Sequence, residues 1–284
     1  MVKRGVIFIL IVLLGFGLCL PLPAVEGSPA IPLMITERAG LDWKSTPITV
    51  GVPVPAQAEW VTVPPRVIDQ WGREVPSQAV LLGNDAAVTN PRWWRITFLG
   101  SINKNDLLNY RVVPGREQRV KPGSPVTVHP LANGYLIENG WIRIELKADE
   151  PLLSRVWFDP NGRGAFSEQI PVIASPVQLG VKTEQGIYET SAASPALLKI
   201  TEAGPVRVVV RLYGELVQAQ QTERINYDCR LLVYAESPYL RMEITFANQT
   251  SSAYLEEAWL KFKSLPGEEN YQLTLGAGVK TPLS

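Results

Sequence analysis

Four arginines recur on the polar side of three segments in which apolar and polar residues alternate. Arg207 and Arg211 occur in PVRVVVRLYGEL, Arg230 occurs in YDCRLLVYAE and Arg241 occurs in YLRMEITFAN. A guanidinium binds a carboxylate through two parallel hydrogen bonds, so this row predicts a cationic strip for acidic ligands such as uronates. The alternative is cross-strand ion pairing on an exposed sheet face. Asp228 and Glu243 alternate with the arginines, which favours this second interpretation.

A second candidate binding feature is the pair Trp93 and Trp94 in NPRWWRITFLG, which Arg92 precedes. Neighbouring side chains of a strand point to opposite faces, so one indole should face a core and the other solvent or a ligand. An outward tryptophan beside an arginine presents an apolar ring face that suits a sugar ring. Trp71, in IDQWGRE, is a further candidate for carbohydrate binding.

The sequence argues against several other kinds of site. His129 is the only histidine, so zinc sites with several imidazoles are excluded and we expect no metal and no other cofactor. A serine triad would need His129, and no G-x-S-x-G motif is present. Lys plus Arg and Asp plus Glu each number 27, which gives no electrostatic case for a nucleic-acid partner. Carboxylates lie on predicted strands, but nothing pairs two of them across a cleft: Glu138, Glu145, Glu215, Asp228 and Glu243.

Residues 1–27 are predicted to be a signal peptide. Lys3 and Arg4 precede an apolar stretch at 6–20, and Gly27 and Ala30 offer small residues for cleavage. The apolar stretch is shorter than the ~20 residues of a membrane span, which favours cleavage and a periplasmic or extracellular location. The alternative is an uncleaved anchor that tethers the protein to a membrane, and no other membrane contact is expected.

Short β-like segments between frequent prolines and glycines predict an all-β protein. Residues 31–121 contain several short strands with turns between them, which predict a small β-barrel, and the charged stretch 116–128 predicts a linker. Residues 129–265 carry longer strands with one apolar face, which predict an antiparallel β-sandwich. The Asn139–Gly140 pair predicts a hairpin within it. Residues 266–284 are interpreted as an incomplete C-terminal tail.

Two groups of segments resemble the exo-rhamnogalacturonan lyase family of YetA-like, or PcRGLX-like, proteins. ITVGVPVPAQAEW, RVIDQWGREVPSQAVLL and RWWRITFLG resemble its N-terminal RIFT barrel. IENGWIRIEL, EAGPVRVVVRLYGE and YDCRLLVYAESPYLRMEITFAN resemble the supersandwich-like β-sandwich that follows. The resemblance covers about residues 47–265. It departs at residues 90–92, where the family has Asp-Gly-Ser, and after the sandwich, where the family continues into a helical toroid domain.

The resemblance implies a protein that acts on or binds pectic and other acidic plant or cell-wall polysaccharides, such as rhamnogalacturonan. The helical domain is the partner that the family would supply, so the chain is expected to be non-catalytic alone. In a lyase's β-elimination the four arginines would neutralise the uronate, and no residue stands out as the base. Trp94 falls on the family's strand tryptophan and is predicted to be buried. Trp93 is predicted to face outward, and packing against the second domain is preferred to sugar stacking.

Two further hypotheses stay open. A stand-alone carbohydrate-binding protein would retain glycan without forming product, and a structural cell-surface protein would do neither. Exposure of Trp71 and Trp93 would favour the binding module, whereas burial of both would favour the structural protein.

Overall fold

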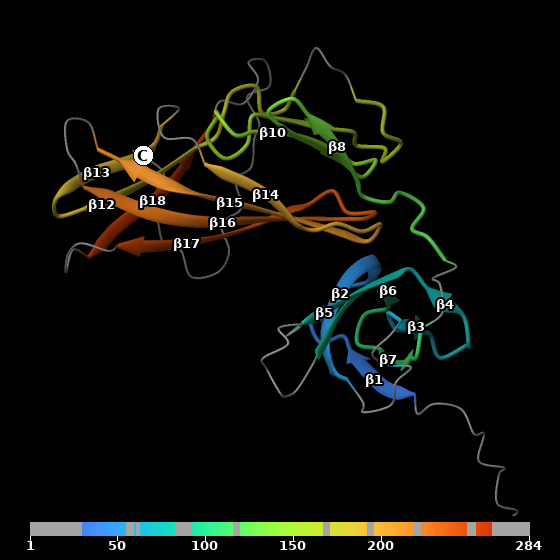
Figure 1. Ribbon diagram of the computed structural model, residues 1–284. Helices are drawn as coiled ribbons and strands as arrows, with labels where there is room; N and C mark the ends of the chain where they lie inside the picture. Colours follow the sequence, from blue (N-terminus) through green and yellow to red (C-terminus); the bar gives the residue numbers. More distant parts are fainter. Residues whose placement is uncertain are drawn as a thin grey trace, which may run out of the picture.

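The all-β prediction is confirmed by the computed structural model (Figure 1), whose named elements are the antiparallel strands β1 to β18. The structure describes residues 30–54, 60, 63–82, 93–115, 120–166, 171–191, 196–218, 223–248 and 254–262. The strands form an N-terminal domain of two sheets and a larger β-sandwich, and Arg92 lies outside the described residues.

The N-terminal domain packs two small sheets around one apolar core. One sheet has the order β1 (Ile31–Thr36), β7 (Leu107–Val113), β3 (Arg66–Ile68) and β4 (Glu74–Val75). The other has the order β2 (Trp43–Pro53), β6 (Trp93–Ile102) and β5 (Ser77–Leu82). Trp60, Trp94 and Phe98 are among the largest side chains of the core. The more specific RIFT-barrel assignment of this domain stays a prediction.

A proline, Pro47, lies inside β2 without interrupting it. It pairs in register with Leu99 of β6. β2 has a partner on one side only, so a residue without an N–H is tolerated there.

A buried carboxylate, Glu37, fastens the loop that leads from β1 to β2. It accepts hydrogen bonds from the backbone N–H of Ala39 at 2.6 Å, of Gly40 at 3.0 Å and of Asn105 at 2.8 Å, and from the indole of Trp43 at 3.3 Å. These contacts, first among them the one from Asn105, lower the pKa of Glu37 to about 2. These partners tie the loop to the start of β2 and to the turn between β6 and β7, so the role of this carboxylate is structural.

The sandwich packs a four-stranded sheet against a seven-stranded one. The smaller sheet has the order β11 (Arg155–Phe158), β10 (Ile142–Lys147), β9 (Gly134–Glu138) and β8 (Thr127–Leu131). The larger has the order β17 (Leu240–Asn248), β16 (Arg224–Tyr234), β15 (Arg207–Val217), β13 (Gly186–Thr190), β12 (Gln178–Thr183) and β18 (Leu255–Lys261), and β14 (Leu197–Glu202) also pairs with β15.

The inward positions predicted for the longest strands form the sandwich core. The following side chains are buried in it: Ile142, Ile144, Leu146, Val206, Val208, Val210, Leu212, Tyr227, Cys229, Leu231 and Val233. The predicted inward side chains of β17 are partly buried against the same core. In the segment of β18 the alternation predicts that Ala258, Leu260 and Phe262 continue the apolar face. This prediction is wrong, because Leu260 is 42% exposed and Phe262 is 49% exposed. β18 pairs only with β12 at the edge of the sheet, where burial is incomplete.

The predicted hairpin joins β9 to β10, and its asparagine is buried. Gly140 has a φ of 85°, the left-handed conformation that glycine adopts readily. The Asn139 side-chain oxygen accepts hydrogen bonds from the N–H groups of Trp141 and Ile142. Its amide donates to the carbonyls of Tyr234 at 2.6 Å and Ser237 at 2.8 Å, so the turn is also fastened to the end of β16.

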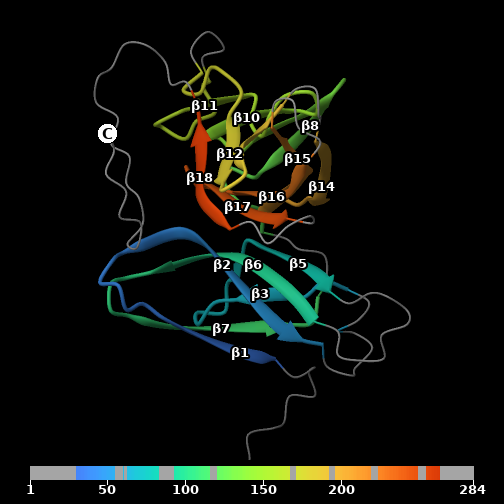
Figure 2. The ribbon, with the colours of Figure 1, turned by 90° about the vertical axis from the view of Figure 1, so that its left-hand side faces the viewer.

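The two domains contact each other through β5 and β6 on one side and the β14–β15 turn on the other. The Gln78 amide donates to Glu202 and to the carbonyl of Arg207, and its oxygen accepts from the N–H groups of Val206 and Arg207. A Cβ added at Gly204 would lie 2.2 Å from the Gln78 side-chain oxygen, so only glycine permits this approach. Leu99 of β6 joins the sandwich core. The β2-β6-β5 sheet is the layer nearest the sandwich in both views (Figures 1 and 2).

Candidate functional site

A groove of about 590 Å³ lies between the domains, and five arginines line it: Arg95, Arg207, Arg211, Arg230 and Arg241. Its walls are the outer faces of two sheets, because the opposite faces of the same strands form the two cores. Thr49, Val80 and Leu82 complete the wall from the N-terminal domain. The structure therefore brings the four arginines predicted from the sandwich strands together and adds a fifth from β6.

Alternate residues of β6 share the strand face that is turned toward the sandwich. Leu99 is 6% exposed in the sandwich core, and Thr97 is 1% exposed beside Arg207. Arg95, which lines the groove, comes next on the same face. Trp93 lies on that face at the start of β6 and is 41% exposed. Since a strand advances by about 3.4 Å per residue, Trp93 and Arg95 lie roughly 7 Å apart along the strand.

Two of the predicted arginines are ion-paired on the sheet face. Arg211 forms two hydrogen bonds with Asp228, at 2.9 and 2.7 Å, and these contacts raise the pKa of Arg211 above its usual value. Arg241 lies 2.9 Å from Glu243. Both pairs fit the structural interpretation of the arginine row, because each guanidinium has its own carboxylate.

Arg230 differs from its neighbours. It stands opposite Arg211 on β15 and opposite Glu243 on β17, is exposed, and forms no ion pair within the described part of the chain. The nearest acidic partners on the adjacent strands are bound by Arg211 and Arg241. Arg230 is therefore a cation in the groove whose charge is not neutralised by any carboxylate of the described residues.

Glu202, Arg95 and Arg207 form a three-residue cluster beside the groove, which we call the Glu202 cluster. The Glu202 side chain is 4% exposed and one of its oxygens accepts from both guanidiniums, with the Arg207 contact at 2.6 Å. Its other oxygen accepts from Gln78 at 2.8 Å. Arg95 belongs to the N-terminal domain and the other two residues belong to the sandwich, so this carboxylate joins the domains electrostatically.

Sequence reasoning missed Arg95 and Glu202. Arg95 stands two residues after Trp93, so strand alternation places both on one face, and this was the signal that could have found it. Glu202 carried no signal, because its two cationic partners lie 5 and 107 residues away in the chain. The other buried carboxylates of the described residues, Glu37, Asp69 and Asp159, bind backbone N–H groups of turns and loops.

The two tryptophans of β6 divide as the alternation predicts. Trp94 is 5% exposed and its indole donates to the carbonyl of Trp60 at 2.8 Å, so it is a core residue. The ring of Trp93 lies against Gly51 of the same sheet and stays partly exposed. The structure therefore does not favour the predicted packing of Trp93 against the second domain.

Trp71 is not part of the groove. It is 63% exposed on the turn between β3 and β4, which belongs to the other sheet of the N-terminal domain. The guanidinium of Arg73 lies over its ring, 4.9 Å from the ring centre. Asp69 holds this turn through the backbone N–H groups of Trp71 and Arg73. Trp71 and the arginines therefore form separate surfaces.

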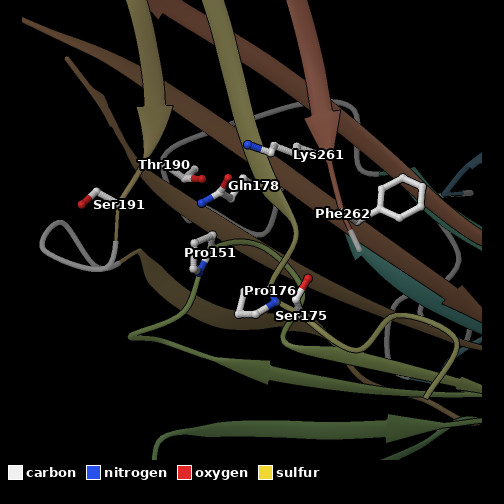
Figure 3. A pocket seen from close by; sticks show the side chains of 8 residues that line it. All are labelled: Pro151, Ser175, Pro176, Gln178, Thr190, Ser191, Lys261 and Phe262. Atoms are coloured by element: carbon white, nitrogen blue, oxygen red, sulfur yellow. The ribbon is translucent and has the colours of Figure 1, made fainter. Parts of the chain in front are cut away.

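A second cavity, of about 500 Å³, lies at the ends of β12, β13 and β18 (Figure 3). Phe262 contributes its aromatic ring, and the polar groups of the cavity come from Ser175, Gln178, Thr190, Ser191 and Lys261. The Thr190 hydroxyl accepts a hydrogen bond from the backbone of Leu179, so it is already engaged. With Lys261 as the cation among its lining residues, this cavity offers much less positive charge than the groove.

Other chemistry has little support in the described residues. No group of three metal-ligating side chains occurs among them, and none of their helices is long and apolar enough to cross a membrane. Glu138, Glu145 and Glu215 each lie near a basic partner, namely Arg143, Lys147 and Arg224. Burial raises the pKa of the Cys229 thiol to about 12, so this group is not a nucleophile at neutral pH.

Comparison with known proteins agrees with the sandwich. No curated protein matches the chain. Among solved structures, an alpha-mannosidase from Enterococcus faecalis V583 has a TM-score of 0.51 and 12% sequence identity, which shows a likeness of fold. The match covers 80% of this chain but only 31% of that protein. A family model described as the PcRGLX-like protein central beta sandwich domain matches residues 126–269, which include β8 to β18. By this match over half of its length, the chain belongs to the PcRGLX-like family through that family's central β-sandwich domain.

Proposed function

We propose that the protein binds acidic polysaccharide in the groove between its domains, as the N-terminal β region of an exported protein resembling rhamnogalacturonan exo-lyases. The observation that carries this proposal is the charge of the groove. Five arginines face three carboxylates, Glu202, Asp228 and Glu243, which leaves an excess of two positive charges among these described residues. Guanidinium groups in a concave surface attract and orient carboxylates, so a uronate-containing chain suits this groove.

The exposed tryptophans support a binding role over a purely structural one. Trp93 and Trp71 both keep a large part of the ring exposed. Trp93 also lies on the groove-facing side of β6, where its apolar ring face can stack on a sugar while Arg95 reaches a carboxylate. Trp71 would form a separate contact on the other sheet.

Binding without catalysis is proposed for this chain alone. In β-elimination a cation neutralises the uronate and a base removes the C5 proton. The arginines suit the first role. For the second role the described lining residues offer Tyr234 and Glu243, which pairs with Arg241, and neither stands out as the base.

Replacing Arg230 with alanine is expected to weaken the affinity for polygalacturonate about tenfold, because hydrogen bonds to charged groups contribute about 1.5–3 kcal/mol. Arg230 has no competing ion pair in the described part of the chain, so the loss reports ligand contact and not a broken protein interaction. Isothermal titration calorimetry at low salt measures the effect, and added salt should weaken wild-type binding further.

Arg155→Ala is the matched control, since Arg155 is an exposed strand arginine of the smaller sandwich sheet. Trp93→Ala should also weaken binding, whereas a neutral galactan should bind poorly to every variant. Equal affinity of the Arg230→Ala variant and the wild type, or equal binding of galactan and polygalacturonate, contradicts the proposal. Absence of any glycan binding favours the structural cell-surface protein.

The export part of the proposal has its own test. Expression of the whole chain with its first 27 residues should place the protein outside the cytoplasm, with a new N-terminus after Gly27 or Ala30. N-terminal mass spectrometry of the recovered protein measures this. A protein that keeps Met1 and stays with the membrane fraction supports the uncleaved anchor instead.

A further inference from the structure

The Glu202 cluster is unbalanced in charge. Two guanidiniums share one carboxylate, and the Arg207 side chain is only 6% exposed. The second terminal nitrogen of Arg207 donates a hydrogen bond to the neutral hydroxyl of Thr97 in the N-terminal domain, at 3.5 Å. An uncompensated charge in such a place costs free energy, because protein surroundings screen it less than water does.

The cluster also has unused hydrogen-bond donors. The Nε atoms of Arg95 and Arg207 are both buried and have no partner among the described residues. Buried donors without partners are rare in native proteins, and a bound anion can supply the acceptor that they lack. Both side chains line the groove, so the excess charge and the donors lie beside it.

We propose that the space beside Arg95 and Arg207 is a carboxylate-binding subsite, in which a ligand carboxylate bridges the two domains. The proposal rests on the acidic-glycan function and names the place where one carboxylate binds. Glu202 occupies one side of the guanidinium pair and the ligand carboxylate occupies the side that faces the groove. Trp93, roughly 7 Å further along the same strand face, then receives a neighbouring sugar ring.

A ligand carboxylate that bridges the two domains adds a contact between them, whereas a carboxylate bound to one domain does not. Arg95 and Arg207 come from different domains, so the ligand adds a contact that exists only while the domains are docked. Ligand that binds the folded state alone raises the melting temperature as its concentration rises. The carboxylate should therefore stabilise the docked protein, and a neutral sugar should not.

The test measures the melting temperature of the whole chain with D-galacturonate, D-galactose, acetate or sodium chloride at matched ionic strength. Galacturonate is expected to raise it and galactose and chloride are not. A shift with acetate assigns the subsite to carboxylates in general, and a larger shift with galacturonate assigns it to sugar acids. Both results support the proposal, whereas an equal shift with chloride overturns it.

Arg95→Ala should raise the dissociation constant for galacturonate tenfold or more. Arg111→Ala and Arg155→Ala are the controls, because neither arginine is among the residues that line the groove, and they should leave the dissociation constant unchanged. If Arg95→Ala does not fold, Arg95→Lys replaces it. Arg95→Lys keeps the charge but loses the planar fork, and a several-fold weaker affinity is expected. Wild-type affinity in the folded Arg95 variant overturns the subsite. If Arg230→Ala still weakens polygalacturonate binding in that case, the proposed function stands without this subsite. If neither variant changes binding, both proposals fail.

Discussion

Replacing Glu202 with glutamine is expected to lower the free energy of unfolding by about 3–5 kcal/mol, the range found when one partner of a buried ion pair is removed. The substitution keeps the shape of the side chain but removes the charge that two guanidiniums share. It also leaves Arg207, which is nearly fully buried, without a carboxylate. Urea unfolding followed by circular dichroism at neutral pH measures the loss.

Glu243→Gln is the control for this prediction. Glu243 pairs with Arg241 on the exposed sheet face, where the carboxylate is 42% and the guanidinium 66% exposed. Exposed pairs contribute about 0–1 kcal/mol, so this variant should stay close to the wild type. If Glu202→Gln is no less stable than Glu243→Gln, the Glu202 cluster does not hold the domains together and the charge argument for the carboxylate subsite loses its basis.

Replacing Asn139 with alanine is expected to cost about 3–5 kcal/mol, because each buried polar group left without a partner costs about 1–3 kcal/mol. Asn139 is 1% exposed and forms four side-chain hydrogen bonds, all with backbone groups. Two lie within the hairpin turn and two reach Tyr234 and Ser237. The free energy of unfolding from urea titration is the measurement.

Two further variants accompany this prediction. Asn133→Ala is the control for the loss of an asparagine, and Asn139→Asp separates the local hydrogen bonds from the long-range ones. Asn133 is an exposed asparagine in the preceding turn, and its replacement should change stability by no more than about 0.5 kcal/mol. Asn139→Asp keeps the acceptor for Trp141 and Ile142 but loses the donor to Tyr234 and Ser237. If the aspartate variant is as stable as the wild type, the long-range bonds contribute little and the local turn accounts for the role of Asn139.

The strands of the sandwich were predictable because a strand's burial repeats every two residues. Ile142, Ile144 and Leu146 alternate with polar neighbours, and the structure buries all three. The same rule predicted that Trp93 and Trp94 face opposite sides, and the family resemblance assigned Trp94 to the core, where the structure has it. The rule failed at β18, where Leu260 has the right spacing but lies on the last strand of the sheet. Alternation identifies the two faces of a strand but not whether another layer covers one of them.

The arginine row shows the same limit at the candidate site. Spacing placed Arg211, Arg230 and Arg241 on one sheet face, and adjacent strands bring them into one groove. Spacing did not show that Arg211 and Arg241 have their own carboxylates while Arg230 has none among the described residues. Cross-strand register decides these partners, and register depends on how the whole sheet assembles. Trp71 was grouped with these arginines by residue type alone, and the fold places it on a different sheet.

The sequence by itself determined the all-β architecture, the hairpin at Asn139–Gly140 and the inward faces of the longest strands. These features depend on local conformational preference and on hydrophobic alternation, which act over a few residues. Only the tertiary structure decided that Arg95 meets Glu202 and Arg207, and that Asn139 fastens the end of β16. Those contacts join residues from 5 to more than 100 positions apart, and the docking of two domains brings Arg95 to its partners. The groove is the product of that docking, since each domain contributes one of its walls.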